Sequence, residues 1–135
     1  MADKKKEQAM VVSQEQIADD IFSMWIHTEA AQSARPGQFI SMYTTDGSKL
    51  LPRPISICEA DKENGRLRIV YRIAGAGTKE FSAYKEGDTL DIMGPLGNGF
   101  PLKKKKAFLI GGGIGIPPML ELAKNLDCEK TAVIG

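Results

Sequence analysis

The stretch that decides the fold is RLRIVYRIAGAGT, residues 66–78. Its first eight residues alternate, with four apolar side chains on one face, Leu67, Ile69, Tyr71 and Ile73, and three arginines on the other, Arg66, Arg68 and Arg72. Alternation with a period of two is typical of a strand that buries one face and exposes the other. Gly75 and Gly77 follow as turn residues. The stretch therefore predicts a strand that ends in a glycine-rich turn.

Runs of the same kind extend from Met10 to Met93 on both sides of this strand. They occupy residues 20–27, 34–43, 50–58 and 85–93, with turn residues between them. Short strands at this spacing, with no long helix between them, are typical of an antiparallel sandwich or barrel. The first hundred residues are thus predicted to be an all-β domain.

One short helix is expected to interrupt the strands, in GAGTKEFSAY, residues 75–84. Thr78 is its expected N-cap, and Glu80 is expected in the first turn, where the helix dipole favours a carboxylate. A glycine-rich entry to a helix leaves backbone N–H groups free to bind phosphate. The alternative is that the two glycines serve only the turn.

The stretch RPIS, residues 53–56, carries the chemistry of a nucleotide-binding strand. The guanidinium of Arg53 is a planar fork of donors that suits phosphate oxygens. The hydroxyl of Ser56 can donate to or accept from a ring nitrogen. Residues three apart on a strand face opposite sides, so one ligand has to bend around the strand to use both. The alternative for Arg53 is a solvated surface arginine.

The last part of the chain begins with AFLIGGGIGIPPML, residues 107–120. This is a strand, a glycine turn and a helix with Pro117 at its first position. Four apolar residues share one face of that helix, Met119, Leu122, Ala123 and Leu126. TAVIG, residues 131–135, is a second strand, so the segment predicts one βαβ unit. Residues 94–106, which end in Lys103–Lys106, are interpreted as the linker before this βαβ unit. The alternatives for the four lysines are contact with nucleic acid or with an acidic redox partner.

Composition limits the function classes. The chain has 135 residues, 42% hydrophobic and 26% charged, and a formal net charge of +1. Such a charge gives no global attraction for nucleic acid or a membrane surface, and no apolar run is long enough for a membrane span. Cys58 and Cys128 form no disulfide framework, which favours a reducing, cytoplasmic location. The single histidine, His27, lies in an alternating run and is interpreted as a surface residue, so chemistry would have to come from a bound cofactor.

Five motifs in order resemble one family: RPIS (53–56), IVYR (69–72), GAGT (75–78), GPLGNGF (94–100) and GGGIGIPP (111–118). They are similar to the electron-transfer subunits of NAD-dependent dihydroorotate dehydrogenases, within the ferredoxin-reductase superfamily. The resemblance implies a six-stranded antiparallel flavin-binding barrel over residues 1–102, followed by the first βαβ unit of an NAD-binding α/β domain over residues 103–135. An aliphatic residue at Ile55, where the wider superfamily often has an aromatic one, favours the dihydroorotate branch.

The resemblance also implies which residues bind cofactors. Those that match the family's FAD contacts are Arg53, Pro54, Ile55, Ser56, Val70, Tyr71, Arg72, Gly77 and Thr78. Gly77 and Thr78 match a loop that holds the FAD pyrophosphate at a helix N-terminus. The glycines that match the loop facing NAD are Gly111, Gly112, Gly113 and Gly115. No catalytic side chain and no metal ligand is expected.

The implied function is electron transfer in pyrimidine biosynthesis. Electrons would pass from dihydroorotate, oxidised on a partner subunit that carries FMN, through a 2Fe–2S cluster to FAD and then to NAD, in a heterotetramer. Such a cluster needs four thiolates, and the chain has two cysteines. We therefore expect the chain to be the N-terminal part of a longer protein and not to be a competent enzyme alone. Residues 107–135 are then expected to pack on a second copy or to be less ordered than the barrel.

Two other functions remain open from the sequence. One is an NAD(P)H-dependent ferredoxin or flavodoxin reductase, which would share the barrel. The other is a non-enzymatic barrel module that binds a partner protein and no flavin. Its binding would be indifferent to substitutions at Arg53 and Ser56.

Overall fold

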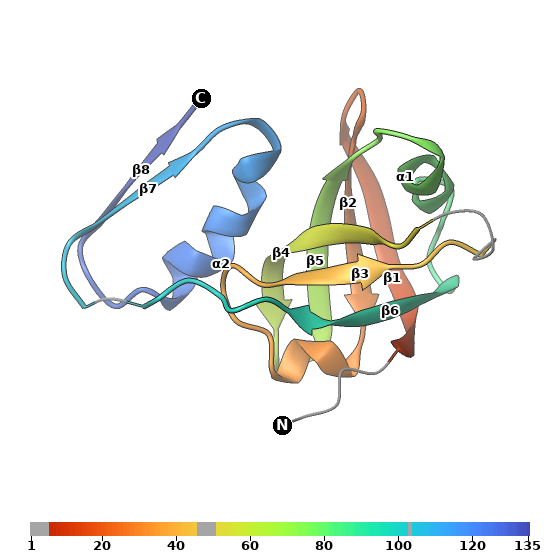
Figure 1. The fold of residues 1–135 in the computed structure, drawn as a ribbon, viewed down its shortest axis with the longest axis horizontal. Helices are drawn as coiled ribbons and strands as arrows, with labels where there is room; N and C mark the ends of the chain where they lie inside the picture. The colour runs from red at the N-terminus through yellow and green to blue at the C-terminus, as the bar shows by residue number, and fades with distance from the viewer. Residues whose placement is uncertain (1–5, 46–50, 103) are drawn as a thin grey trace.

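The computed structural model describes residues 6–45, 51–102 and 104–135, and it divides them into two packed parts (Figure 1). A closed barrel of six strands forms the larger part. The smaller part is a two-stranded sheet with one helix. Among the described residues, no helix has the length and apolar character needed to cross a membrane.

The barrel is antiparallel throughout, in the order β1-β2-β5-β4-β3-β6. Its strands are β1 (Lys6–Ala18), β2 (Ile21–His27), β3 (Phe39–Met42), β4 (Arg53–Asp61), β5 (Arg66–Arg72) and β6 (Thr89–Leu96). This confirms the six-stranded antiparallel barrel that the resemblance implied, where the strand pattern alone had left a sandwich or a barrel open. Strand β6 extends to Leu96, so the irregular linker begins later than the glycine and proline content of residues 94–106 suggested.

The alternation in the sequence places the core. In β5, Leu67, Ile69 and Tyr71 are buried inside the barrel. The antiparallel register sets Ile26 and Met24 of β2 opposite the first two of these residues, and both are fully buried. Burial of this apolar face is the main stabilising contribution, because free energy falls roughly in proportion to the apolar area removed from water. His27 is exposed at the end of β2, as predicted.

The short helix α1 (Ala76–Phe81) corrects one detail of the sequence interpretation. Gly75 is its N-cap, so Thr78 and Glu80 lie further into the helix than predicted. Thr78 does not cap from outside. Its hydroxyl accepts from the backbone N–H of Ala74 at 2.8 Å and donates to the carbonyl of Gly75 at 3.2 Å, which ties the turn to the helix.

Glu80 is likewise not in the first turn. Its carboxylate accepts hydrogen bonds from the backbone N–H of Thr45 at 2.9 Å and from the hydroxyl of Tyr84, also at 2.9 Å. The partner Thr45 is 35 positions away in the sequence, so the local pattern does not reveal this contact. A 3₁₀ turn, η1 (Glu29–Gln32), also escaped prediction; Thr28 caps it.

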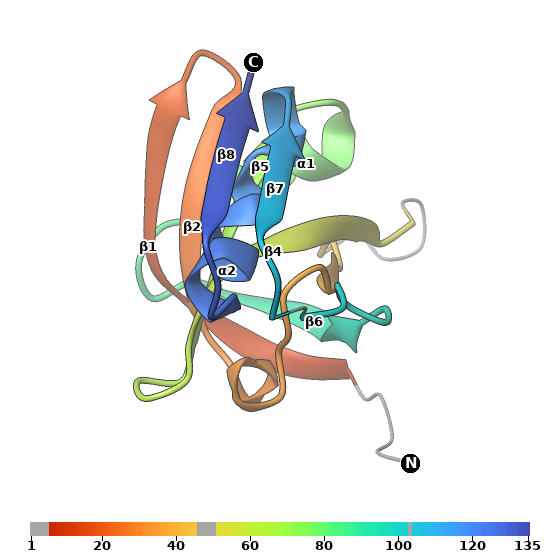
Figure 2. The same ribbon diagram turned by 90° about the vertical axis from the view of Figure 1, so that its left-hand side faces the viewer.

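The smaller part is the predicted βαβ unit. Its elements are β7 (Ala107–Gly111), a 3₁₀ turn η2 (Gly113–Gly115), α2 (Pro117–Asn125) and β8 (Lys130–Ile134), and the two strands are parallel. Leu122 and Leu126 pack with Leu109 of β7 to form a small core. Figures 1 and 2 both show α2 between this sheet and the barrel, and its contacts with the barrel are made with β4. The opposite sheet face exposes Phe108, Ile110 and Val133.

The connection between the two parts runs along the barrel surface. The backbone N–H of Phe100 donates to the carbonyl of Pro36 at 2.7 Å, which holds the connection to the barrel. Lys104, Lys105 and Lys106 are exposed, as expected for a solvated linker. Lys103 lies outside the described residues.

Candidate functional site

A pocket of about 420 Å³ lies where β4 and β5 meet the turn before α1. The residues that line it are Arg53, Pro54, Ile55, Ser56, Val70, Tyr71, Arg72, Ala74, Thr78 and Ile114. Eight of these are among the nine residues that the sequence assigned to FAD. The structure thus brings together residues from two strands and a turn that are separate in the sequence.

Strand β4 contributes one wall of the pocket. Its segment Arg53–Ser56 pairs with β3, and all four residues line the pocket. Because side chains alternate along a strand, four consecutive residues can border one pocket only if backbone atoms form part of its wall. One pocket therefore borders both Arg53 and Ser56.

Of the two arginines that line the pocket, Arg53 is the one whose guanidinium has no carboxylate partner among the described residues. No ion pair or hydrogen bond joins it to any described residue, and the residue is half-buried. Gly77 lies against it: a Cβ atom added at Gly77 would be 3.1 Å from Nε of Arg53 and 3.2 Å from its Cγ. Gly77 does not line the pocket itself, but its missing side chain leaves room for the arginine.

Strand β5 forms the second wall. Tyr71 is 1% exposed, and its ring stacks on Phe22 at a centroid distance of 6.0 Å. Its hydroxyl donates to Oε1 of Gln14 at 2.5 Å, and burial raises the pKa of Tyr71 above its ordinary value. Tyr71 therefore supplies a fixed wall rather than an ionisable group. Arg72 is exposed and pairs with Asp20 at 3.4 Å.

The glycine loop meets this pocket through one residue that the sequence did not single out. Ile114, in η2, lines the pocket and is 39% exposed. The glycines themselves do not line it. Gly113 has a φ of +55°, which favours glycine. An apolar side chain in the middle of a glycine loop was the available signal for Ile114.

Gly111 has a different structural reason to be glycine. A Cβ atom there would be 3.2 Å from Cα of Ile116 and 3.3 Å from Cγ of Met119. Gly111 therefore allows the start of α2 to pack closely on the end of β7. At Gly112 and Gly115 an added Cβ atom would meet no close neighbour.

The pocket fits part of an FAD molecule. Its volume is within the range of about 300–1,000 Å³ that is usual for cofactor sites. Apolar walls from Ile55, Val70 and Ile114 suit a ring system, and the guanidinium of Arg53 suits a phosphate. The hydroxyl of Ser56 makes no hydrogen bond with another described residue.

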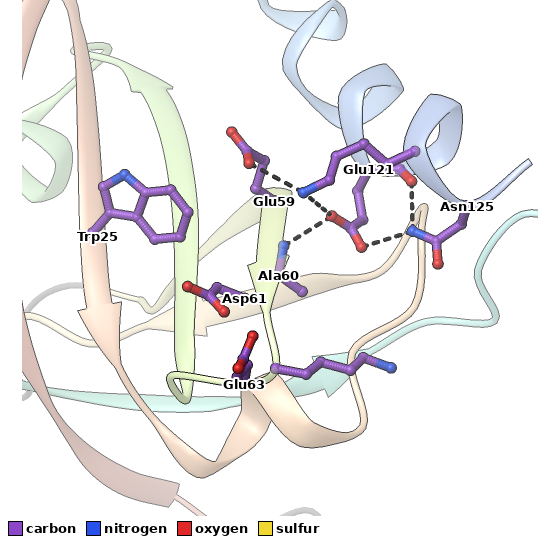
Figure 3. A pocket seen from close by; sticks show the side chains of 9 residues that line it. Trp25, Glu59, Ala60, Asp61, Glu63, Glu121 and Asn125 are labelled. Carbon is purple, nitrogen blue, oxygen red and sulfur yellow. Dashed lines mark hydrogen bonds and ion pairs between the residues drawn. The ribbon is translucent and has the colours of Figure 1, made fainter.

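A second, somewhat larger pocket of about 470 Å³ lies between the β4–β5 hairpin and α2 (Figure 3). Its lining residues are Trp25, Glu59, Ala60, Asp61, Lys62, Glu63, Glu121, Lys124 and Asn125. None of them was predicted to bind a cofactor. Carboxylates outnumber lysines here, which is unfavourable for a phosphate, and within the described ranges no cluster of side chains is arranged to hold a metal ion. The smaller pocket is therefore the candidate cofactor site.

Known proteins that this chain resembles agree with a flavin-binding pocket. A family model described as the oxidoreductase FAD-binding domain matches residues 8–100. The chain is 48% identical over 128 residues to the dihydroorotate dehydrogenase B (NAD(+)) electron transfer subunit of Streptococcus pneumoniae (strain ATCC BAA-255 / R6), covering 92% of this chain and 50% of the relative. It is 43% identical over 135 residues to the subunit of the same name from Lysinibacillus sphaericus (strain C3-41), covering 96% and 52%. The chain thus spans about half the length of the curated relatives it matches.

Solved structures give the same fold. A structure of an NADH-dependent reduced ferredoxin–NADP oxidoreductase superposes with a TM-score of 0.85 at 36% identity, covering 93% of this chain and 47% of the other. Phthalate dioxygenase reductase superposes with a TM-score of 0.75 at 28% identity, covering 96% and 43%. These matches confirm the resemblance that the five motifs carried: the chain belongs to the family of oxidoreductase FAD-binding domains.

Proposed function

We propose that this chain holds FAD in an electron-transfer subunit that carries electrons from a dihydroorotate-oxidising partner to NAD, in pyrimidine biosynthesis. The observation that carries the proposal is the convergence on one pocket of eight residues that the resemblance assigned to FAD. The names of the two curated relatives described above support the choice of donor and acceptor. FAD, when bound, would supply the electron-carrying chemistry, and the protein would supply position and electrostatics.

Each wall of the pocket has a distinct task in this proposal. Arg53, with no carboxylate to neutralise it, would hold the negative pyrophosphate. Ser56 would hydrogen-bond a ring nitrogen, and Ile55 and Val70 would exclude water from the ring. Tyr71 would keep the β5 wall rigid through its bond to Gln14. The hydroxyl of Thr78 is engaged by the backbone, so its part would be to hold the turn before α1 in place.

NAD, an iron–sulfur cluster and a partner subunit would complete the electron path beyond the FAD pocket. The loop with Gly111, Gly112, Gly113 and Gly115 would face NAD, and the division into domains would lie near residue 102. A 2Fe–2S cluster and a catalytic subunit with FMN, assembled as a heterotetramer in the cytoplasm, would complete the path. Cys58 is buried and remote in sequence from Cys128, so cluster ligands would have to come from elsewhere than this chain.

The test uses the protein as its host makes it, purified under anaerobic conditions. Addition of dihydroorotate should bleach the visible absorption of bound flavin, and addition of NAD should restore it. A matched preparation with Arg53→Ala should lose flavin and with it the response. Flavin that is bound but does not respond to dihydroorotate would contradict the proposed electron donor.

A second candidate is favoured by the solved structures, which include reductases that use pyridine nucleotides. In a ferredoxin or flavodoxin reductase the same pocket would hold FAD, but the flavin would be reduced by NAD(P)H and would pass electrons to a small carrier protein. The two candidates separate in the experiment above. Bleaching by NAD(P)H with transfer to ferredoxin, and none by dihydroorotate, would select the reductase.

A further inference from the structure

We propose that Glu121 is a positioning residue: its carboxylate locks α2 onto the free edge of β4 and thereby sets Ile114 on the wall of the FAD pocket. The proposal rests on the proposed function, which assigns that pocket to FAD. It concerns the larger pocket at the seam, whose residues the function has not used so far (Figure 3).

The second half of β4 lacks a strand on one side. Pairing with β3 covers Arg53–Ser56, and the backbone N–H of Ile57 then donates to the carbonyl of Gln38. Beyond that point, among the described strands, β4 pairs only with β5. The backbone N–H of Ala60 is satisfied by Oε1 of Glu121 at 2.9 Å, a bond between residues 61 positions apart. A helix side chain therefore takes the place of a strand partner.

The carboxylate of Glu121 is committed to this contact. Glu121 is 5% exposed, and burial of a carboxylate is costly unless hydrogen bonds satisfy it. Oε1 accepts from Ala60, and Oε2 accepts from Nδ2 of Asn125 at 2.8 Å. Nζ of Lys124 lies 3.8 Å from Oε1. A shift of α2 along β4 would leave a buried charge and a strand N–H unpaired together, so the contact defines one position.

A second link runs beside the first. Nζ of Lys124 pairs with Glu59 of β4 at 3.3 Å. Glu59 pairs with Arg68 of β5 at 2.9 Å, and Nε of Arg68 donates to the hydroxyl of Ser23 of β2 at 2.8 Å. These partly exposed groups are screened by solvent and contribute less than Glu121. They connect α2 to three strands of the barrel.

The apolar core beside α2 is distinct from the core of the barrel. Among the described residues it is formed by Leu109, Leu122 and Leu126. Apolar contact is non-directional, whereas hydrogen bonds to a carboxylate have defined distances and angles. The polar contact at Glu121 is therefore the part of the seam that specifies geometry.

The position of α2 is passed on to the FAD pocket through the glycine loop. The helix begins at Pro117, directly after the loop that carries Ile114. Close packing at Gly111 leaves the start of α2 no room to slide on β7. Because η2 lies beside β5 and Ile114 lines the pocket, a displaced α2 displaces one wall of the FAD pocket.

A double-mutant cycle on the whole chain tests this coupling, with the FAD dissociation constant as readout. Glu121→Ala and Ile114→Ala should each weaken binding about fivefold, the loss expected for one partly buried apolar contact. The double variant should bind no more weakly than Ile114→Ala, because the position of residue 114 matters only while its side chain is present. Additive losses, or no loss in Glu121→Ala, would overturn the proposal.

Four further variants separate positioning from stability. Glu121→Asp keeps the charge but shortens the reach to Ala60, so it should weaken FAD binding as Ala does. Glu121→Gln keeps an oxygen acceptor for the N–H of Ala60 but loses the acceptor for Nδ2 of Asn125, so it should restore binding in part. Glu63 is exposed and lines the same pocket from the hairpin, so Glu63→Ala and Glu63→Asp are matched controls that should have no effect. Loss of binding in these controls, or no rescue by Gln, would contradict the assignment.

A ligand-free measurement keeps the outcome distinct from that of the proposed function. If the unaltered chain bound no FAD, the proposed function would fail, and the methyl resonances of Ile114 would still report the coupling. They should shift in Glu121→Asp and stay in place in Glu63→Asp. Resonances that are unchanged in both variants would overturn the positioning role.

Discussion

Replacement of Arg53 by alanine should weaken FAD binding more than any other single change in the pocket. The guanidinium has no ion-pair partner among the described residues. Its removal therefore breaks no ion pair in the free protein, and the lost free energy is that of FAD binding. Hydrogen bonds to charged groups contribute about 1.5–3 kcal/mol. Arg53 is half-buried, and solvent screening moves the estimate to the lower half of that range.

We therefore expect a loss of about 1.5–2 kcal/mol, or roughly 10- to 30-fold in the dissociation constant. The dissociation constant of Arg53→Lys should lie between those of the unaltered chain and Arg53→Ala, because lysine keeps the charge but lacks the planar guanidinium. Quenching of flavin fluorescence during titration measures all three proteins. The unfolding free energy should be nearly unchanged in Arg53→Ala, since no described ion pair is lost.

The matched control is Arg66→Ala. Arg66 is exposed at the start of β5 and lines a different, smaller pocket. It removes the same charge from the same barrel, so it should leave FAD affinity unchanged. Equal dissociation constants for Arg53→Ala and the unaltered chain, or equal losses for both arginines, would refute the reasoning from local contacts.

Other changes have smaller or different effects. Gly77→Ala should weaken FAD binding about fivefold, because its Cβ atom would press on the arginine of β4; Gly75→Ala, which meets no atom within 4 Å, is the control, and equal affinities would exclude the steric account. Ser56→Ala should lose only about 1 kcal/mol of binding but shift the flavin reduction potential, so an unchanged potential in electrochemical titration would contradict its contact with the ring. Burial raises the pKa of Cys58 above its ordinary value of 9.0, so at pH 8 a thiol reagent should modify Cys128 well before Cys58, and equal rates would contradict the burial. Burial favours the neutral thiol of Cys58, so its pKa is higher in the folded chain than in the unfolded chain. The resulting stabilisation of the folded chain is present below pH 9 and is lost as the pH rises through the folded pKa. Alkaline unfolding of Cys58→Ala, compared with the unaltered chain, measures this loss.

Local periodicity was sufficient for five of the six barrel strands but did not predict β1 (Lys6–Ala18), and the pocket residues came from the resemblance of the motifs to a family. In β5 the apolar positions of the alternating pattern, Leu67, Ile69 and Tyr71, are the ones that the barrel buries. The motifs at 53–56 and 69–72 lie on strands that neighbour each other in the barrel. Their convergence on one pocket therefore followed once the fold was correct.

Long-range polar contacts could not be predicted in the same way. Thr78 has the local features of an N-cap, yet the N-cap is Gly75, three residues earlier, and the hydroxyl of Thr78 accepts a hydrogen bond from the backbone N–H of Ala74. Glu121 is one charged residue in an amphipathic helix, and nothing in its neighbours indicates that its partner is the backbone of Ala60. Such pairs depend on where two separate elements meet, which periodicity does not encode.

The most direct test of the central claim is an NMR titration of the isotopically labelled chain with FAD. The account predicts saturable binding of one FAD, with the largest shifts at Arg53–Ser56, Val70–Arg72 and Ile114 and none in the hairpin at residues 61–65, which borders the other pocket. Shifts centred on that hairpin, or no shifts at saturating FAD, would contradict it.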